Sequence, residues 1–63
     1  MAHKLIFGEV KHVTDRAILF AVDEDGEERE HWIPKSQVED GDEVTDSATE
    51  LYVTTWFAEK MGQ

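Results

Sequence analysis

The residues that could do chemistry are concentrated in one stretch, DEDGEEREHWIPKSQVEDGDE, which runs from Asp23 to Glu43. It contains ten carboxylates around the short apolar segment Trp32–Pro34. Such a cluster could bind a metal ion, carry acid–base catalysis, keep the protein soluble, or attract a basic partner. Each use needs different neighbouring residues, so the surrounding sequence discriminates between them.

Calcium is the first ion to test, because DEDG resembles part of an EF-hand loop. When Gly26 is aligned with the sixth loop position, Ala21 falls at the first position and Trp32 at the twelfth. Both positions require carboxylate ligands, so the match fails. The chain has no cysteine, and no two of its three histidines are spaced two or four residues apart. The sequence therefore predicts neither a metal site nor a cofactor.

Enzymatic activity has little support in the sequence. There is no Gly-x-Ser-x-Gly turn, and Ser36 and Ser47 lie in predicted loops without a histidine beside them. Acid–base catalysis by a carboxylate pair needs one buried carboxyl group with a raised pKa, whereas these acids lie in contiguous hydrophilic runs. A chain of 63 residues also encloses a ligand pocket with difficulty. We predict no catalytic residue.

The charge is large and unevenly distributed. Fifteen Asp and Glu residues face six Lys and Arg residues, which gives a formal net charge of −9. Residues 23–50 hold twelve acids and two bases, a net charge of −10, so the rest of the chain carries +1. Nucleic-acid-binding proteins need a basic footprint, so direct nucleic-acid binding is disfavoured. The acidity favours a basic partner or a role in solubility.

Length and hydropathy indicate a small cytoplasmic protein. The longest apolar run, Ala17–Val22, is far shorter than the roughly 20 residues needed to cross a bilayer. The start MAHKLIF has no signal-peptide pattern, and the absence of cysteine fits a reducing compartment. A chain of this size buries only about 60% of its unfolded surface, which gives some weight to homo-oligomerisation.

Turn signals at short intervals predict one small all-β domain over residues 1–63. We expect an SH3-like or OB-like barrel of four to five short antiparallel strands with a short C-terminal helix. The expected strands are 4–13, 16–23, 27–33 and 49–55, and the expected helix is 55–61.

Within this domain, strand 16–23 is apolar on both faces and is expected at the centre of a sheet. Gly8 predicts a bulge or a close backbone approach in the first strand. Asp25–Gly26 predicts a hairpin turn.

Trp32 and Ile33 must point to opposite faces of their strand. We expect Ile33 in the core and Trp32 on the other face, covered by the terminal helix or by a second subunit. The following turn is either a structural corner or a recognition surface.

The predicted function is that of a non-enzymatic interaction protein whose acidic loops engage a basic site. A rigid negative surface can imitate the phosphate backbone and occupy the basic groove of a nucleic-acid-binding protein. The candidate partner-binding residues are Asp23, Glu24, Asp25, Glu27, Glu28, Glu30, Trp32, Lys35, Glu39, Asp40, Asp42 and Glu43.

Two other functions stay open. One is a single-stranded nucleic-acid-binding module that uses Trp32, Tyr52 and Lys35. The other is a structural homo-oligomer in which Trp32 or Trp56 packs between subunits.

Three stretches, Thr14–Ala17 (TDRA), Trp32–Gln37 (WIPKSQ) and Trp56–Gly62 (WFAEKMG), carry a resemblance that spans most of the chain. The chain resembles small proteins of bacteriophages and of phage-derived or mobile regions of bacterial genomes, a group without an established activity. The resemblance implies a phage-like setting in a bacterial host cell, where tiny acidic proteins frequently inhibit host machinery. It favours a host defence protein that binds nucleic acid as the basic partner.

Overall fold

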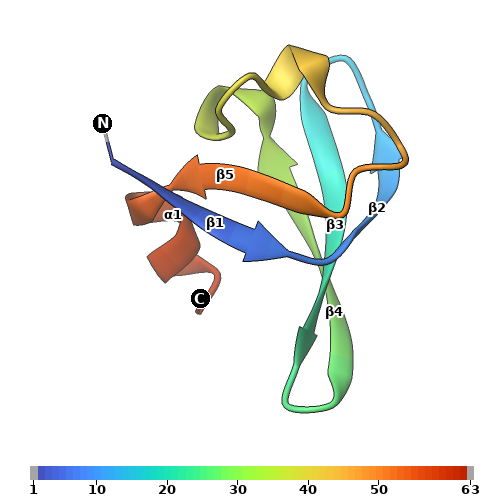
Figure 1. The fold of residues 1–63 in the computed structure, drawn as a ribbon, viewed down its shortest axis with the longest axis vertical. Helices are drawn as coiled ribbons and strands as arrows, with labels where there is room; N and C mark the ends of the chain where they lie inside the picture. Colours follow the sequence, from blue (N-terminus) through green and yellow to red (C-terminus); the bar gives the residue numbers. More distant parts are fainter. Residues whose placement is uncertain (1, 63) are drawn as a thin grey trace.

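The chain folds into two antiparallel sheets and a short C-terminal helix (Figure 1). The structure is a computed structural model, which describes residues 2–62. The elements in chain order are β1 (His3–Phe7), β2 (Glu9–Val13), β3 (Ala17–Glu24), β4 (Glu27–Pro34), the 3₁₀ helix η1 (Lys35–Gln37), the 3₁₀ helix η2 (Gly41–Glu43), β5 (Glu50–Thr54) and α1 (Thr55–Lys60). The predicted antiparallel β class with a terminal helix is confirmed.

The larger sheet has the strand order β2-β3-β4, so the predicted central position of β3 is confirmed. Ile18 and Phe20 are fully buried on one face of β3, while Leu19 on the other face is only half-buried. The apolar residues on both faces explain this position, because a central strand exposes little surface on either side.

The prediction of one strand over residues 4–13 is wrong, because the chain forms two strands separated at Gly8. The strand before Gly8, β1, pairs with β5, and the strand after it, β2, pairs with β3. The predicted close approach at Gly8 is confirmed, because a Cβ atom there would collide with the backbone carbonyl of Ala21 and the ring of Phe20. The irregularity in pairing lies elsewhere, between Val10 and His12.

The β3–β4 hairpin closes with the predicted Asp-Gly turn. Asp25 and Gly26 have φ values of 55° and 84°, the positive values that a type I′ turn requires at both central positions. Glu24 and Glu27 pair directly across the turn. This hairpin projects at the lower end of Figure 1.

The segment after β4 crosses to the other sheet. Pro34 ends β4, and the N–H of Lys35 donates a 2.8 Å hydrogen bond to the carbonyl of Arg16. The turn after Pro34 is η1. Val38 then bridges to Val53, and η2 lies at the upper end of Figure 1.

The C-terminal helix α1 begins at Thr55, the predicted first residue. The hydroxyl of Thr54 accepts a 3.2 Å hydrogen bond from the N–H of Phe57, which caps the first turn. Phe57 and Met61 are buried against the end of the β1–β5 sheet. A single core lies between the two sheets and the helix, made by Ile6, Val10, Ile18, Phe20, Val22, Ile33, Val38, Leu51, Val53, Phe57, Ala58 and Met61.

Candidate partner-binding surface

The first acidic run occupies the end of the β3–β4 hairpin. Asp25 lies in the turn, and the cross-strand pair Asp23–Glu28 lies two residues further along the strands. Glu24 differs from its neighbours, because its side chain is only 20% exposed and lies 3.5 Å from Nε2 of His31. The acids from Asp23 to Glu28 therefore form a charged tip beyond the core, whereas Glu30 lies further along β4, opposite the buried Ala21.

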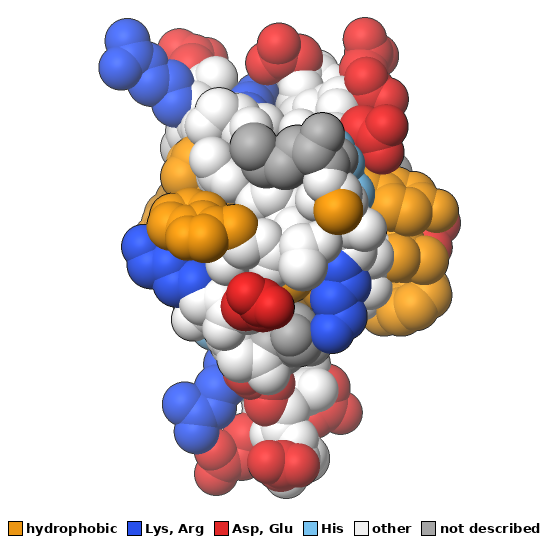
Figure 2. Space-filling model, turned by 90° about the vertical axis from the view of Figure 1, so that its left-hand side faces the viewer, with side chains coloured by type: hydrophobic (Ala, Val, Ile, Leu, Met, Phe, Trp, Pro, Cys, Tyr) orange, Lys and Arg blue, Asp and Glu red, His pale blue; other side chains and the backbone are white. Residues whose placement is uncertain are grey.

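The second acidic run, residues 39–43, lies around η2 at the opposite end of the longest axis. Figure 2 shows acidic side chains gathered at both the upper and the lower end of the body. The body measures 29 Å along this axis. The two runs therefore do not meet in the single patch that the sequence left open, and the molecule instead has two acidic ends.

Few of the ten carboxylates are neutralised within the described part of the chain. Glu28 pairs with Lys11, Glu27 pairs with Arg29, and Glu24 faces His31, which is cationic only when protonated. The other seven form no ion pair with residues 2–62: Asp23, Asp25, Glu30, Glu39, Asp40, Asp42 and Glu43. Their charge is available to an external cation.

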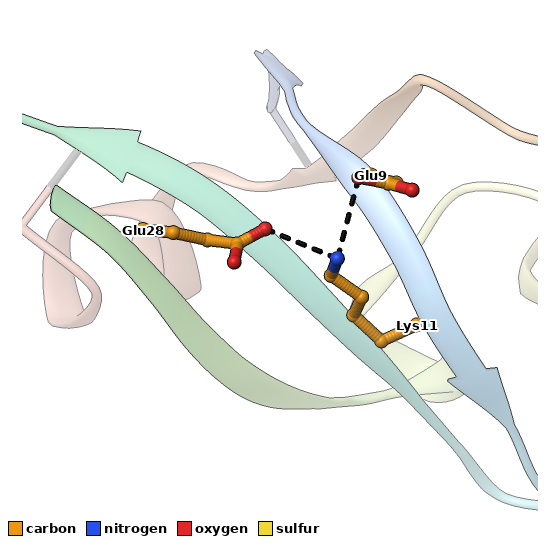
Figure 3. A network of polar contacts seen from close by, with 3 residues as sticks. All are labelled: Glu9, Lys11 and Glu28. Carbon is orange, nitrogen blue, oxygen red and sulfur yellow. Dashed lines mark hydrogen bonds and ion pairs between the residues drawn. The ribbon is translucent and has the colours of Figure 1, made fainter. Parts of the chain in front are cut away.

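Lys11 forms a network with the carboxylates of Glu9 and Glu28 (Figure 3). Glu9 and Glu28 lie on the face of the larger sheet opposite the core residues Val10 and Val22, which we call the outer face. The Nζ of Lys11 lies 3.2 Å from Glu28 and 3.3 Å from Glu9. The hydrogen bond to Glu28, followed by that to Glu9 and by their charges, raises the pKa of Lys11. Sequence reasoning missed Glu9 and Lys11, since only the strand register brings Glu28 to them.

Trp32 also lies on the outer face, with its neighbour Ile33 in the core as predicted. Its side chain is 53% exposed. The ring meets His12 edge to face, with centroids 6.3 Å apart and an interplanar angle of 90°. The expected cover by the terminal helix is wrong, because α1 packs on β1 and β5. Trp32 thus presents an aromatic surface beside acids.

The residues of the alternative nucleic-acid platform come from three different elements. Trp32 lies on β4, Lys35 begins η1, and Tyr52 lies on the outward side of β5 opposite Leu5. No aromatic contact joins Trp32 to Tyr52 within residues 2–62. The structure therefore does not assemble them into one stacking surface.

Two further aromatic residues are exposed, of which Trp56 was expected only as a subunit contact and Phe7 was not expected at the site. Phe7 is 66% exposed and Trp56 is 60% exposed. Trp56 makes an intramolecular cation–π contact with Lys60, whose Nζ lies 5.3 Å from the ring centroid. The four-residue spacing from Trp56 to Lys60 in the predicted helix places the two side chains on one face.

A shallow hollow lies near each acidic end. The hollow of about 390 Å³ on the outer face is lined by Gly8, Glu9, Ala21, Asp23, Gly26 and Glu28. The hollow of about 560 Å³ near η2 is lined by Lys35, Ser36, Val38, Asp40, Gly41, Asp42 and Glu43.

Residues 2–62 contain no group of three or more His, Asp or Glu side chains arranged to hold a metal ion. No helix in this part of the chain is long and apolar enough to span a membrane.

Comparisons of the chain with models of protein families, with curated proteins and with solved structures give no match. The surface must therefore be interpreted from its own geometry and charge.

Proposed function

We propose that this protein is a non-enzymatic, acidic interaction protein that binds a basic site on a partner. The observation that carries the proposal is the set of seven carboxylates without an ion pair in the described chain, six of which lie at the two ends of a 29 Å body. Unneutralised acids on a rigid scaffold attract a positive surface and steer its approach.

The preferred partner is a nucleic-acid-binding protein of the host, whose groove the acidic ends occupy in place of nucleic acid. Duplex DNA carries one negative charge per roughly 1.7 Å of axis, so its binding grooves hold basic residues over tens of ångströms. Two acidic ends on a 29 Å axis suit two separate basic regions of such a groove. The resemblance to phage and mobile-element proteins supports a defence protein as the target and the bacterial cytoplasm as the location.

For the fold, we propose that the two sheets are halves of one small SH3-like or OB-like open barrel. Support comes from the single core that both sheets share, and from the chain's passage between them at Gly8. A barrel of this kind would hold the two acidic ends at a fixed separation.

The test is a pull-down from bacterial lysate at low and high salt with the tagged protein. The comparison variant carries Asp25→Lys, Glu28→Lys, Asp42→Lys and Glu43→Lys. A matched control, Glu59→Lys, reverses one acid outside the two runs. We expect a nucleic-acid-binding protein that only the wild type and Glu59→Lys retain, and that salt and added duplex DNA release. Retention that survives both salt and charge reversal would contradict the proposal.

A second candidate function, a structural homo-oligomer, is favoured by one observation. Phe7 and Tyr52 are 66% and 49% exposed on the outward side of the two-stranded sheet. Figure 2 shows hydrophobic side chains at the margins of the body, where a second subunit would cover them. A monomer mass at all concentrations in sedimentation equilibrium would remove this candidate.

A further inference from the structure

We propose that the outer face of the three-stranded sheet, centred on Trp32 and Glu30, docks an extended partner segment with arginine or lysine at alternate positions. This inference rests on the proposed function, because it names the part of the surface that recognises the basic partner. The carboxylates around η2 lie at the other end, outside this face, and would meet the partner's second basic region.

The strand register arranges the outer face in three rows across the sheet. Because directly paired residues share a face, His12, Leu19 and Trp32 form the first row. Glu9, Ala21 and Glu30 form the second row. The third row is the pair Asp23–Glu28.

Successive rows are two residues apart along β4, which is about 7 Å. An extended segment that runs along the strand presents side chains to this face at the same interval. Cations at alternate positions would therefore meet the indole of Trp32, the carboxylate of Glu30 and the pair Asp23–Glu28 in turn. In a helical segment, cations at alternate positions would not face the sheet together, because residues two apart on a helix do not lie on the same face.

The charge of the face fits such a segment. Besides the single ammonium of Lys11, the three rows hold the four carboxylates Glu9, Asp23, Glu28 and Glu30, which leaves a net charge of −3. Figure 3 shows that the face already holds an ammonium group, since Lys11 lies within 3.3 Å of both Glu9 and Glu28. The hollow of about 390 Å³ next to this network gives room for a further cationic side chain.

Trp32 differs from the other exposed tryptophan in what lies beside it. Lys60 lies over the ring of Trp56, whereas no lysine or arginine of residues 2–62 lies over the ring of Trp32. Indole is the best aromatic acceptor of a cation–π contact. The 53% exposed ring of Trp32, which meets His12 edge to face, can therefore accept a cation–π contact from a partner beside Glu30.

The probe is a fluorescein-labelled peptide of four Arg-Thr repeats, measured by fluorescence anisotropy at low salt. A control peptide of the same composition carries its four arginines together, so only the spacing differs. Trp32→Ala and Glu30→Gln test the face, and Trp56→Ala and Glu43→Gln are their matched controls elsewhere on the surface. We expect Trp32→Ala to raise Kd for the alternating peptide by about two- to fivefold, and Trp56→Ala to leave it unchanged.

Nuclear magnetic resonance locates the site within one sample. During titration of the ¹⁵N-labelled protein with the alternating peptide, we expect the indole N–H signal of Trp32 to shift and saturate. The signal of Trp56 should stay in place. The ¹⁵N spectra of the variants show whether each retains its fold.

The outcomes separate this inference from the proposed function. If Glu30→Gln and Glu43→Gln lower the affinity for the alternating peptide equally and Trp32→Ala does not change it, the docking face is wrong. The proposed function as an acidic interaction protein is then unaffected. Equal affinity for the two peptides would contradict the inference that the bound segment is extended with cations at alternate positions. If neither peptide binds the wild type at low salt, the docking face fails, while the pull-down still decides the proposed function.

Discussion

Thr54 and Gln37 are joined by a 2.7 Å hydrogen bond, in which the Thr54 hydroxyl donates to Oε1 of Gln37. The same hydroxyl accepts the N–H of Phe57 at 3.2 Å and so caps α1. Thr54 is 4% exposed. One side chain thus links the turn after Pro34 to the start of the helix, which makes Gln37 part of a structural corner.

Thr54→Ala should lower the free energy of unfolding by about 1–2 kcal/mol, because it removes the helix cap and leaves the Gln37 amide without its partner. Thr54→Ser, which keeps a hydroxyl, is the control and should lose less. Urea denaturation measures both. A Thr54→Ala effect that is unchanged in a Gln37→Ala background would show that the two side chains are energetically independent, contrary to this prediction.

Trp32 and Ile33 are adjacent residues with opposite expected effects on stability and binding. Ile33 is 0% exposed, so Ile33→Ala should cost about 2–5 kcal/mol of stability through lost burial and a cavity. Trp32→Ala should cost about 1 kcal/mol or less, since the ring is half exposed. Thermal or urea unfolding of the two variants decides this, and comparable losses would place Trp32 in the packed core.

Gly8→Ala should destabilise the protein by about 1–3 kcal/mol, because the added Cβ meets the carbonyl of Ala21 and the ring of Phe20. Gly26→Ala is an informative comparison, since nothing lies within 4 Å of its added Cβ. Its cost comes only from the positive φ of 84° and should be about 1 kcal/mol. If urea unfolding shows a Gly8→Ala loss no greater than that of Gly26→Ala, the close approach is not a steric constraint.

Lys11 should make a pH-dependent contribution to stability at the alkaline end. Hydrogen bonds to Glu28 and Glu9 raise its pKa above the ordinary value of 10.5. Because the pKa of Lys11 is higher in the folded state, its contribution to the free energy of unfolding is complete below the unfolded-state pKa. This contribution declines as the pH rises through the folded-state pKa. The titration midpoint of the Lys11 side chain, followed by NMR, should fall in Glu28→Gln and remain in Glu43→Gln. Equal midpoints in all three proteins would contradict the network.

The local parts of the fold were predictable from the sequence. The Asp25–Gly26 turn requires positive φ at both positions, Thr54 is a good helix cap, and the doubly apolar strand 16–23 belongs at the centre of a sheet. Each of these features depends on neighbouring residues alone. The burial of Ile33 and the exposure of Trp32 followed from the two-residue period of a strand.

The long-range parts were not predictable in the same way. Where the strand 4–13 divides depends on which strands pair with each half, and β5 lies more than 40 residues after β1. The separation of the two acidic runs depends on the same topology, because the hairpin turn and η2 lie at opposite ends of β4 and its continuation. The Lys11 network required the register of three strands. Exposure of Phe7 had no local sequence signal.

The pairing of β1 with β5 has a consequence for synthesis. Until residues 50–54 have left the ribosome, β1 has no strand to pair with, and the apolar side chain of Ile6 has no Leu51 opposite it. The β2-β3-β4 meander has short connections and can form earlier, since local contacts need less loop closure. The core therefore closes late in synthesis. A chain truncated before Glu50 would lack β5 and would leave β1 with an unpaired strand edge.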